Sequence, residues 1–285
     1  MNYFLIISSL LVTFLINLTY ASPFNHDRCV LPKGKVLKIG CTKDCGRFNR
    51  WALYRFARKS GYKIELHNLY SERESVDIDA MDAIYIPGGA DINPKYYISK
   101  VEKELQEKIK SLDHLVDYSD SGDRRDPFEY ELLQKYFSNK SMAKTPILGV
   151  CRGMQMLAVS QGIPLYVDIK AELGIRNRRY KLDRVYVQSK NSEISKIMRR
   201  SRFRGVELHH QGPRVDYFKK HKDERWPNIN LTALSNRGRI AEVLEWTDRP
   251  VLGVQFHPEY TFGKVRRRIF KSFLNQACHK KVSEL

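Results

Sequence analysis

Charged residues are absent from the first 21 positions of this 285-residue sequence. Residues 4–18 form an apolar run that is too short for a typical membrane span. The small residue Ala21 precedes Ser22 and Pro23, as at a secretory cleavage site, although the usual Lys or Arg near the start is missing. We therefore predict a signal peptide over 1–21 and an exported mature chain, periplasmic or secreted, over 22–285. An uncleaved anchor is the alternative.

Acidic residues are few compared with basic ones: 32 Asp and Glu stand against 50 Lys and Arg, a net charge of +18 at pH 7. Such an excess can attract anionic ligands, lipid surfaces or nucleic acid. The sequence lacks a zinc finger, a glycine-rich RNA-binding signature and densely interleaved aromatic residues. We interpret the charge as a solvated basic surface, and expect no nucleic-acid partner and no membrane contact after signal cleavage.

Cysteine is scarce, with five residues in the chain. Four remain beside Cys151, namely Cys29, Cys41, Cys45 and Cys278, and an oxidising compartment could pair them in a way that the sequence leaves open. The spacing of His, Asp and Glu supplies no convincing set of three metal ligands, so we predict neither a metal nor a cofactor. Internal repeats and low-complexity linkers are also lacking, which favours one domain over 22–285.

A strand that ends at a cysteine is the centre of the sequence. Residues 146–150 read as a buried strand, and a helix is predicted from Arg152, with Gly149 and Gly153 on either side of Cys151. This is the cysteine form of a nucleophile elbow, in which a tight turn exposes the sulfur above the sheet. The helix start would direct free N–H groups at a developing oxyanion. A buried structural cysteine is the alternative reading of this segment alone.

The first half of the chain predicts a parallel α/β sheet, because strands alternate with helices or short crossovers. The expected strands are 36–40, 63–69 and 83–86, and the expected helices are 47–60 and 101–112. The last of these strands ends at Pro87-Gly88-Gly89, a turn on the carboxyl edge of the sheet where ligand crevices form. Its unhindered N–H groups suit an oxyanion hole.

Another helix is expected to begin at Asp126 as N-cap, with Pro127 at its first position, and to run to about Phe137. The second half carries shorter strands, which predict an antiparallel flank joined to the parallel sheet. Those strands are 165–169, 184–188, 205–208, 231–235, 240–246 and 251–256, with a hairpin turn at 236–239. A final helix is predicted from Lys264 to about His279.

His257 and Glu259 follow the last of these strands. Residues two apart on an extended segment point the same way, so both side chains can serve one site. His257 can take the proton of Cys151 and pass it to a leaving amine, while Glu259 orients the imidazole and stabilises its cation. We predict these three residues as a catalytic triad.

Three motifs in this order resemble the class I glutamine amidotransferase superfamily: Pro87-Gly88-Gly89, Gly149-Val-Cys151-Arg-Gly153 and His257-Pro258-Glu259. Longer matches are similar to its branch of gamma-glutamyl-gamma-aminobutyrate hydrolase-like cysteine peptidases. They are the run from Pro87 to Pro94 with Tyr97, the run from Arg125 to Glu129, and His209-His210-Gln211-Gly212. The similarity covers about residues 36–275.

The resemblance implies a flavodoxin-like three-layer α/β/α sandwich with a mostly parallel central sheet and an antiparallel flank. It also implies hydrolysis of a small γ-glutamyl amide through a γ-glutamyl thioester on Cys151. The backbone N–H of Arg152, with that of Gly88 or Gly89, would form the oxyanion hole. Gln155, His210 and Gln211 would contact the substrate.

The leaving group stays open, because residues 205–208 depart from the small polar run of the family and because an exported enzyme is unusual for polyamine catabolism. An exported basic chain could act on γ-glutamyl peptides or on poly-γ-glutamyl chains, as the related folate γ-glutamyl hydrolases do. A glutaminase of the same superfamily and a catalytically inactive basic binding protein are the alternatives. The oligomeric state is open, with a homodimer as one option.

Overall fold

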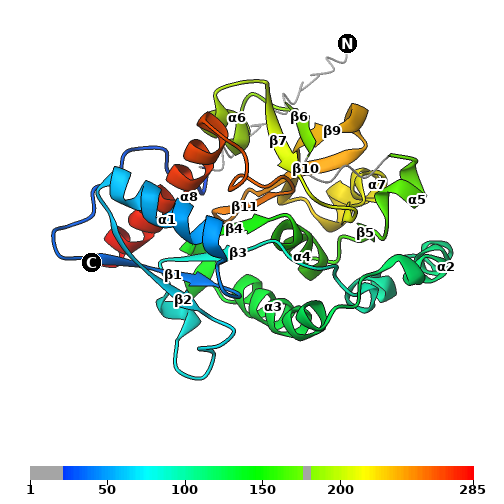
Figure 1. The fold of residues 1–285 in the computed structure, drawn as a ribbon, viewed down its shortest axis with the longest axis horizontal. Coiled ribbons are helices and arrows are strands. Elements are labelled where there is room, and N and C mark those ends of the chain that lie inside the picture. Colours follow the sequence, from blue (N-terminus) through cyan, green and yellow to red (C-terminus); the bar gives the residue numbers. More distant parts are fainter. Residues whose placement is uncertain (1–21, 176–180) are drawn as a thin grey trace, which may run out of the picture.

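A nine-stranded sheet crosses the middle of the protein in this computed structural model, which describes residues 22–175 and 181–285 (Figure 1). The strand order is β2-β1-β3-β4-β11-β10-β9-β6-β7. The first five run parallel and every later pairing is antiparallel, as the sequence predicted. The strands are β1 Val36–Cys41, β2 Lys63–Asn68, β3 Ala83–Ile86, β4 Ile147–Val150, β6 Lys181–Val187, β7 Arg202–Glu207, β9 Ile229–Ser235, β10 Ile240–Trp246 and β11 Val251–Val254. A separate pair joins β5 Leu165–Tyr166 to β8 Gly212–Pro213.

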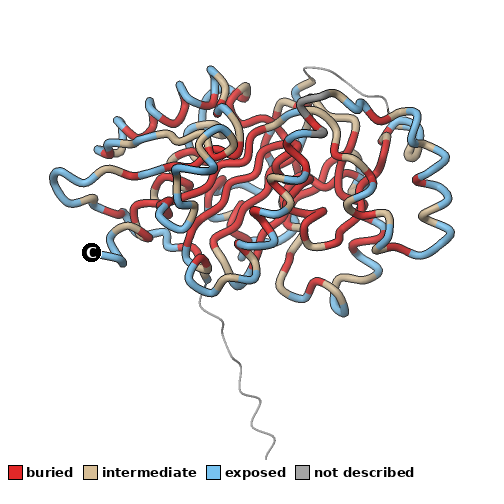
Figure 2. Tube along the Cα trace, turned by 90° about the horizontal axis from the view of Figure 1, so that it is seen from below, coloured by how far each residue is buried: buried red, intermediate tan, exposed pale blue. Residues whose placement is uncertain are grey.

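Helices cover both faces of the central sheet, so the predicted α/β/α sandwich is confirmed. One face carries α1 (Arg47–Ser60), α6 (Glu193–Met198) and α8 (Lys264–Ser283). The other carries α2 (Lys103–Ser111), α3 (Asp120–Ser138), α4 (Arg152–Ser160) and α7 (Val215–Arg225). Figure 2 shows the buried strands between more exposed outer segments.

Strand β3 shows how a short apolar run builds two cores at once. Ala83 and Tyr85 belong to the hydrophobic cluster under α1 and α8, while Ile84 and Ile86 belong to the cluster under α3 and α4. Successive side chains of a strand point to opposite faces, and a parallel sheet covered on both sides needs apolar residues on both. The continuous apolar runs of β3 and β4 therefore place these strands at the centre of the molecule.

The predicted start of a helix at Asp126 was wrong. Helix α3 begins at Asp120, with Ser119 as N-cap, and Pro127 lies inside it. The carboxylate of Asp126 accepts hydrogen bonds from the side chain of Arg152 and from the backbone N–H of Asn93, at 2.9 Å for the latter. An Asp-Pro pair resembles a helix start, but here the aspartate serves a tertiary contact.

The predicted strand over residues 165–169 is also shorter than expected. It ends at Tyr166, and α5 (Ile169–Leu173) begins after Asp168, whose side chain caps the helix by accepting a hydrogen bond from the N–H of Ala171. The sequence reading also missed α6 and α7. Both are short and polar on one side, so their apolar periodicity is weak.

The segment that follows the predicted signal peptide is held against α8. Phe24 is buried in the core, and the N–H of Cys29 donates to the side chain of Asn275 at 3.0 Å. Disulfides join Cys29 to Cys278 and Cys41 to Cys45, which leaves Cys151 as the free thiol among the described residues. The predicted signal peptide itself lies outside these residues, and none of their helices has the length and apolarity of a membrane span.

Loss of the Cys29–Cys278 disulfide should destabilise the fold strongly, because the bond links residues 249 positions apart. We expect the double change Cys29→Ser and Cys278→Ser to lower the free energy of unfolding by about 2–4 kcal/mol, measured by denaturant titration. The matched control removes Cys41 and Cys45, which are 4 positions apart, and should cost less. Equal losses in the two variants would contradict this ranking.

Candidate active site

Cys151 occupies a strained turn between β4 and α4. Its backbone φ is 53° and its ψ is −108°, and its N–H donates to the carbonyl of Val254 on the neighbouring strand β11 at 2.7 Å. A β-carbon on Gly153 would lie 2.1 Å from the carbonyl oxygen of Ile86, so only glycine lets α4 approach β3 this closely. Strain of this kind in a non-glycine residue is typical of a nucleophile elbow.

His257 and Glu259 lie beside Cys151 because β11 is the parallel neighbour of β4. The imidazole Nδ1 is 2.7 Å from Oε1 of Glu259, and both side chains are buried. The predicted reason for this contact was wrong, since the two residues lie in a turn after β11 rather than on an extended segment. The predicted proximity of the three residues is nevertheless present in the structure.

The charge of the imidazole depends on its two neighbours. Burial acts to lower the pKa of His257, but the Cys151 sulfur, by charge and hydrogen bond, and the Glu259 carboxylate outweigh it and raise this pKa to about 10. With Nδ1 engaged by Glu259, the other ring nitrogen is left for the sulfur. The site thus favours an imidazolium beside the sulfur of Cys151 at neutral pH.

The turn Pro87-Gly88-Gly89 adjoins the triad, as predicted. A β-carbon on Gly88 would lie 2.9 Å from Cε1 of His257, so the turn can approach the imidazole only without a side chain. The guanidinium of Arg125 donates to the carbonyl oxygens of Pro87 at 3.1 Å and Gly88 at 3.0 Å. In the described parts of the chain, the N–H groups of Gly88 and Gly89 donate no hydrogen bond.

A buried ionic network, comprising Arg125, Asp126, Glu129 and Arg152, underlies this turn. Glu129 accepts from Arg125 at 2.7 Å, from Arg152 and from the hydroxyl of Thr42, while Arg152 also donates to Asp126. Burial disfavours the charge of Glu129, but the two guanidinium groups hold the pKa of its carboxyl below the ordinary value. The guanidinium of Arg152 is therefore engaged in this network, and its backbone N–H, at the start of α4, remains the group predicted for the oxyanion hole.

The sequence reading did not assign a role to Arg125 or Glu129. Both were noted only within the motif that carried the family resemblance. Their spacing of four residues places them on one helix face, which is the signal that could have paired them. The target of Arg125, the glycine turn, lies more than 30 residues earlier and could not be read from local sequence.

The three predicted substrate contacts differ in their surroundings. Gln155 is buried and donates to the carbonyl of Gln211 at 2.9 Å, and the side-chain oxygen of Gln211 accepts from the N–H of Ile92 at 3.0 Å. His210 is half-buried between Asp91 at 2.7 Å and Asp168 at 3.2 Å, and the hydrogen bond that its imidazole donates to Asp91 is the main reason why its pKa is raised. A substrate role for all three remains a prediction, and His210 is the most accessible of them.

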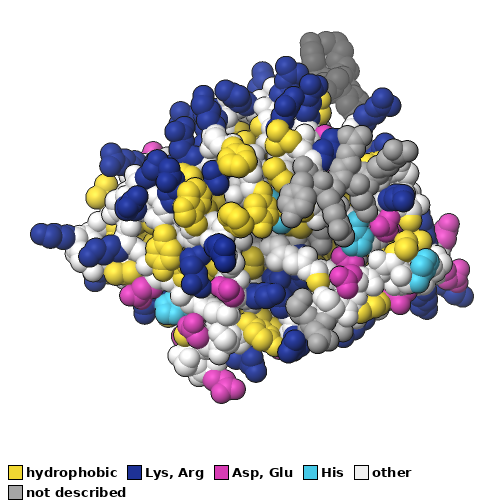
Figure 3. All heavy atoms as spheres, in the orientation of Figure 1, with side chains coloured by type: hydrophobic (Ala, Val, Ile, Leu, Met, Phe, Trp, Pro, Cys, Tyr) yellow, Lys and Arg dark blue, Asp and Glu magenta, His cyan; other side chains and the backbone are white. Residues whose placement is uncertain are grey.

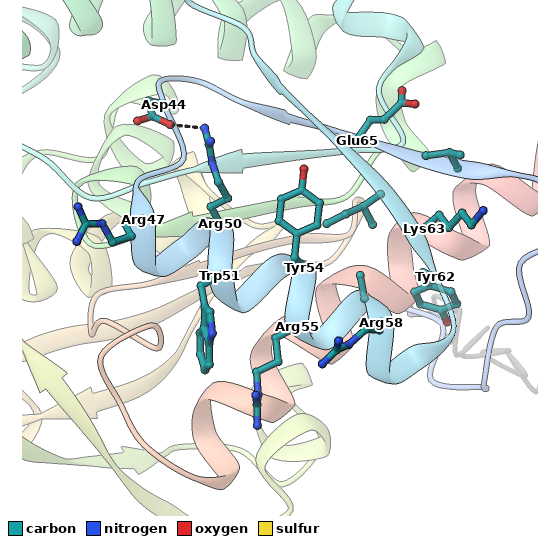
Figure 4. Close-up of a pocket in the computed structure, with 13 residues that line it drawn as sticks. Asp44, Arg47, Arg50, Trp51, Tyr54, Arg55, Arg58, Tyr62, Lys63 and Glu65 are labelled. Carbon is teal, nitrogen blue, oxygen red and sulfur yellow. Dashed lines mark hydrogen bonds and ion pairs between the residues drawn. The ribbon is translucent and has the colours of Figure 1, made fainter.

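A large groove lies away from the triad. It runs along α1 to the start of β2, holds about 1010 Å³, and is lined by Arg47, Arg50, Trp51, Tyr54 and Arg58 among others (Figure 4). Its lining residues are mainly cationic and aromatic and include no cysteine. The groove is therefore separate from Cys151 and forms part of the surrounding surface.

Comparison with known proteins assigns the chain to the same superfamily as the motifs do. The family model of peptidase C26 matches residues 69–259, a span that contains the glycine turn, Cys151, His257 and Glu259. A glutamine amidotransferase-like protein of Schizosaccharomyces pombe is 27% identical over 72% of this chain and 74% of its own length. NtpR of Enterococcus hirae is 27% identical over 66% of this chain and 70% of its own.

Solved structures share the fold at low sequence identity. The glutaminase domain of Trypanosoma brucei CTPS, solved with bound acivicin, has a TM-score of 0.61 and 16% identity, covering 86% of this chain and 94% of that one. A GMP synthase component from Thermoplasma acidophilum has a TM-score of 0.54 and 19% identity, covering 88% of this chain and 99% of that one. The predicted superfamily and fold class are confirmed.

Arg125→Met should impair turnover more than substrate binding. The variant loses both hydrogen bonds to the glycine turn, so the N–H groups predicted to stabilise the oxyanion are less well fixed. We expect kcat for a chromogenic γ-glutamyl anilide to fall about 10–100-fold, with KM changed much less. The matched control Thr42→Val removes another partner of Glu129 without touching the turn, and should lose stability but keep kcat within about threefold. A folded Arg125→Met variant with unchanged kcat would refute this role.

Glu259→Gln should narrow the pH range of activity from the alkaline side. The carboxylate contributes to the raised pKa of His257, so without it the imidazolium is lost at a lower pH. We expect the alkaline limb of kcat/KM to move down by at least about one pH unit and kcat to fall ~10²-fold or more. Thr261→Val is the control, because it removes the hydroxyl bond to the carbonyl of His257 and keeps the carboxylate. An unmoved limb in Glu259→Gln would contradict the proposed cause of the shift.

Proposed function

The chain belongs to the peptidase C26 family, and from this premise we propose that it is an exported cysteine hydrolase of γ-glutamyl amide bonds. The observation that carries the proposal is the continuous contact from the Cys151 sulfur through His257 to Glu259, beside a glycine turn. This arrangement suits an amide carbonyl attacked by a thiolate. The family supports amide hydrolysis or amide transfer, and the γ-glutamyl specificity is part of the proposal.

The reaction would proceed in two steps. The thiolate of Cys151 attacks the γ-carbonyl carbon, and the carbonyl electrons move to the oxygen, which accepts hydrogen bonds from the N–H of Arg152 and of Gly88 or Gly89. The carbon–nitrogen bond then breaks as the imidazolium of His257 protonates the leaving amine. Water, deprotonated by His257, attacks the resulting γ-glutamyl thioester, and the carbon–sulfur bond breaks, releasing glutamate and restoring the thiolate and the imidazolium.

An aromatic and basic surface next to the site favours acidic substrates. Tyr260 lies between the imidazole of His257, at 5.5 Å, and the exposed ring of Phe48, at 5.2 Å. Further out, the guanidinium of Arg266 stacks between Trp51 and Phe262. Figure 3 shows Lys and Arg side chains around hydrophobic ones on the part of the molecule that α1 and α8 occupy. Carboxylates of a longer γ-glutamyl chain would find cations there.

Strands β6 and β7 extend this basic surface. Arg184 and Arg204 are exposed and lie directly opposite each other across the two strands. Like charges in this position repel unless an anion lies between them. We therefore infer that the leaving group carries carboxylates, as in γ-glutamyl peptides or oligo-γ-glutamyl chains, rather than a neutral or cationic amine.

The two disulfides support export. Such bonds form and persist in oxidising compartments and are rare in the cytosol. The pairing of four cysteines around a free Cys151 fits a protein that passes through a secretory route, in line with the predicted signal peptide over 1–21. The mass of the protein recovered from its native location tests this, since a chain that still contained residues 1–21 would contradict cleavage before Ser22.

Mass spectrometry of the acyl-enzyme tests the reaction. The wild type and Cys151→Ala are exposed briefly to neutral γ-glutamyl amides, acidic γ-glutamyl oligomers and free glutamine, and intact masses are recorded. We expect a γ-glutamyl adduct on the wild type alone, and faster turnover of the acidic oligomers that weakens as salt is raised.

Other outcomes of this experiment reject defined parts of the proposal. Turnover of glutamine with release of ammonia, and of nothing else in the panel, would establish the glutaminase alternative. Cleavage of neutral amides with acidic oligomers untouched would reject the acidic leaving group. No adduct and no turnover under reducing conditions would favour a catalytically inactive binding protein.

A further inference from the structure

We propose that Glu207, His209 and Glu242 bind a divalent transition-metal ion, with zinc the best match to their ligand atoms. One donor atom from each side chain lies within 4.8 Å of the other two. The three residues come from the end of β7, the loop that follows it and β10. Sequence spacing could not reveal the group, because 33 positions of chain separate the histidine from the second glutamate.

Glu242 reaches this cluster through an irregularity in β10. In the pairing of β10 with β9, Ala241 lies opposite Leu234 and Val243 lies opposite Ala233. Glu242, between them on β10, therefore has no partner on β9 and forms a β-bulge. Bulges redirect side chains and are common next to active sites. A glutamate here would otherwise have to lie among the apolar residues that flank it in β10.

The carboxylate of Glu242 lacks the partners that a buried charge needs. The residue is fully buried, and its polar neighbours among the described residues include the hydroxyl of Ser235 and the carboxylate of Glu207, neither of which is a cation. Its charged neighbours include Glu207 and Asp183, both acidic. In the described part of the chain, no lysine or arginine forms an ion pair with it. A buried carboxylate costs free energy unless a cation or a proton neutralises it.

His209 is oriented like a metal ligand. Its Nδ1 lies 2.8 Å from the carbonyl oxygen of Gln211, and because a carbonyl only accepts, this nitrogen carries the proton. Its Nε2 is buried and has no hydrogen-bond partner in the described chain. Metal-binding histidines commonly donate their second ring N–H to a carbonyl in this way. The free nitrogen and the two carboxylates therefore form a set of acceptors that face one another.

The ligand types favour zinc over magnesium or calcium. Magnesium and calcium prefer sites made of oxygen atoms, whereas zinc accepts imidazole and carboxylate together at about 2.0–2.2 Å. Three protein ligands leave one tetrahedral position for water. To bind zinc at these distances, the three donor atoms would have to lie closer together than they do in the structure. Rotation of the two glutamate side chains can bring them closer.

The ion would fix the segment that carries the catalytic base. The carbonyl of Val206, next to Glu207, accepts from the N–H of His257 at 2.8 Å, and the carbonyl of Glu242 accepts from the N–H of Gln255 at 2.9 Å. One ligand residue, Glu242, and the neighbour of another, Val206, are thus hydrogen-bonded to the segment that holds His257. The site would connect β7 and β10 behind that turn and would take no part in the proton transfers.

Metal binding is tested in a Cys151→Ala background, so that the catalytic thiol cannot bind the ion and activity is not the readout. The protein is stripped with a chelator and titrated with zinc by calorimetry, and cobalt is added separately for absorption spectroscopy. We expect one zinc per chain and the visible bands of tetrahedral cobalt. Glu242→Gln should weaken zinc binding at least ~50-fold and abolish the cobalt bands, because one of three ligands is lost.

The matched control is His67→Asn. His67 also lies between two glutamates, but it is on β2 and already contacts Glu72 at 3.0 Å. Its loss should leave the stoichiometry and affinity unchanged. If Glu242→Gln fails to fold, Glu207→Gln on the edge strand β7 replaces it, with the same expectation. No zinc binding by the folded background protein, or equal binding by the folded glutamate variants, would overturn the proposal and indicate instead that the two glutamates share a proton.

Discussion

The ionic network of Arg125, Asp126, Glu129 and Arg152 is the interaction on which the site depends. It joins three elements: the glycine turn after β3, helix α3 and the first residue of α4. Buried charges are costly unless each is paired, so the network specifies one arrangement of these elements more than it adds net stability. Helix α4 can therefore hold the strained Cys151 in place.

Much of the fold followed from the sequence, because parallel strands bring their carboxyl ends to one edge. The adjacency of β3, β4 and β11 gathers the glycine turn, Cys151 and His257 although 170 residues separate the first from the last. Predictions from the sequence were wrong or absent for residues whose contacts lie far away along the chain. In the local sequence Asp126 resembles a helix cap, but in the structure its carboxylate accepts a hydrogen bond from Arg152. Glu242 lies in a bulge that no periodicity predicts.

The covalent bonds of the chain divide its cysteines into two classes. Four are paired in disulfides at the outer end of α8 and near the start of α1, whereas Cys151 lies at the sheet edge, buried beside His257. In the oxidising compartment that we propose, the thiol of Cys151 meets the chemistry that forms the other bonds. All five cysteines are buried, so the position of Cys151 after β4, with β3 between that strand and β1, is what separates its sulfur from Cys41.

Two buried polar clusters thus flank the predicted triad. The ionic network holds Cys151 and the glycine turn through α3 and α4, while Glu207, His209 and Glu242 lie behind the turn of His257 on β7 and β10. The ionic network has two positive and two negative charges, so it is neutral without a bound ion. The second contains acceptors and no basic partner for Glu242 among the described residues, so its neutrality must come from a proton or an ion. Because only the second cluster depends on a proton or an ion, the position of His257 should respond to pH and to metal ions more than that of Cys151.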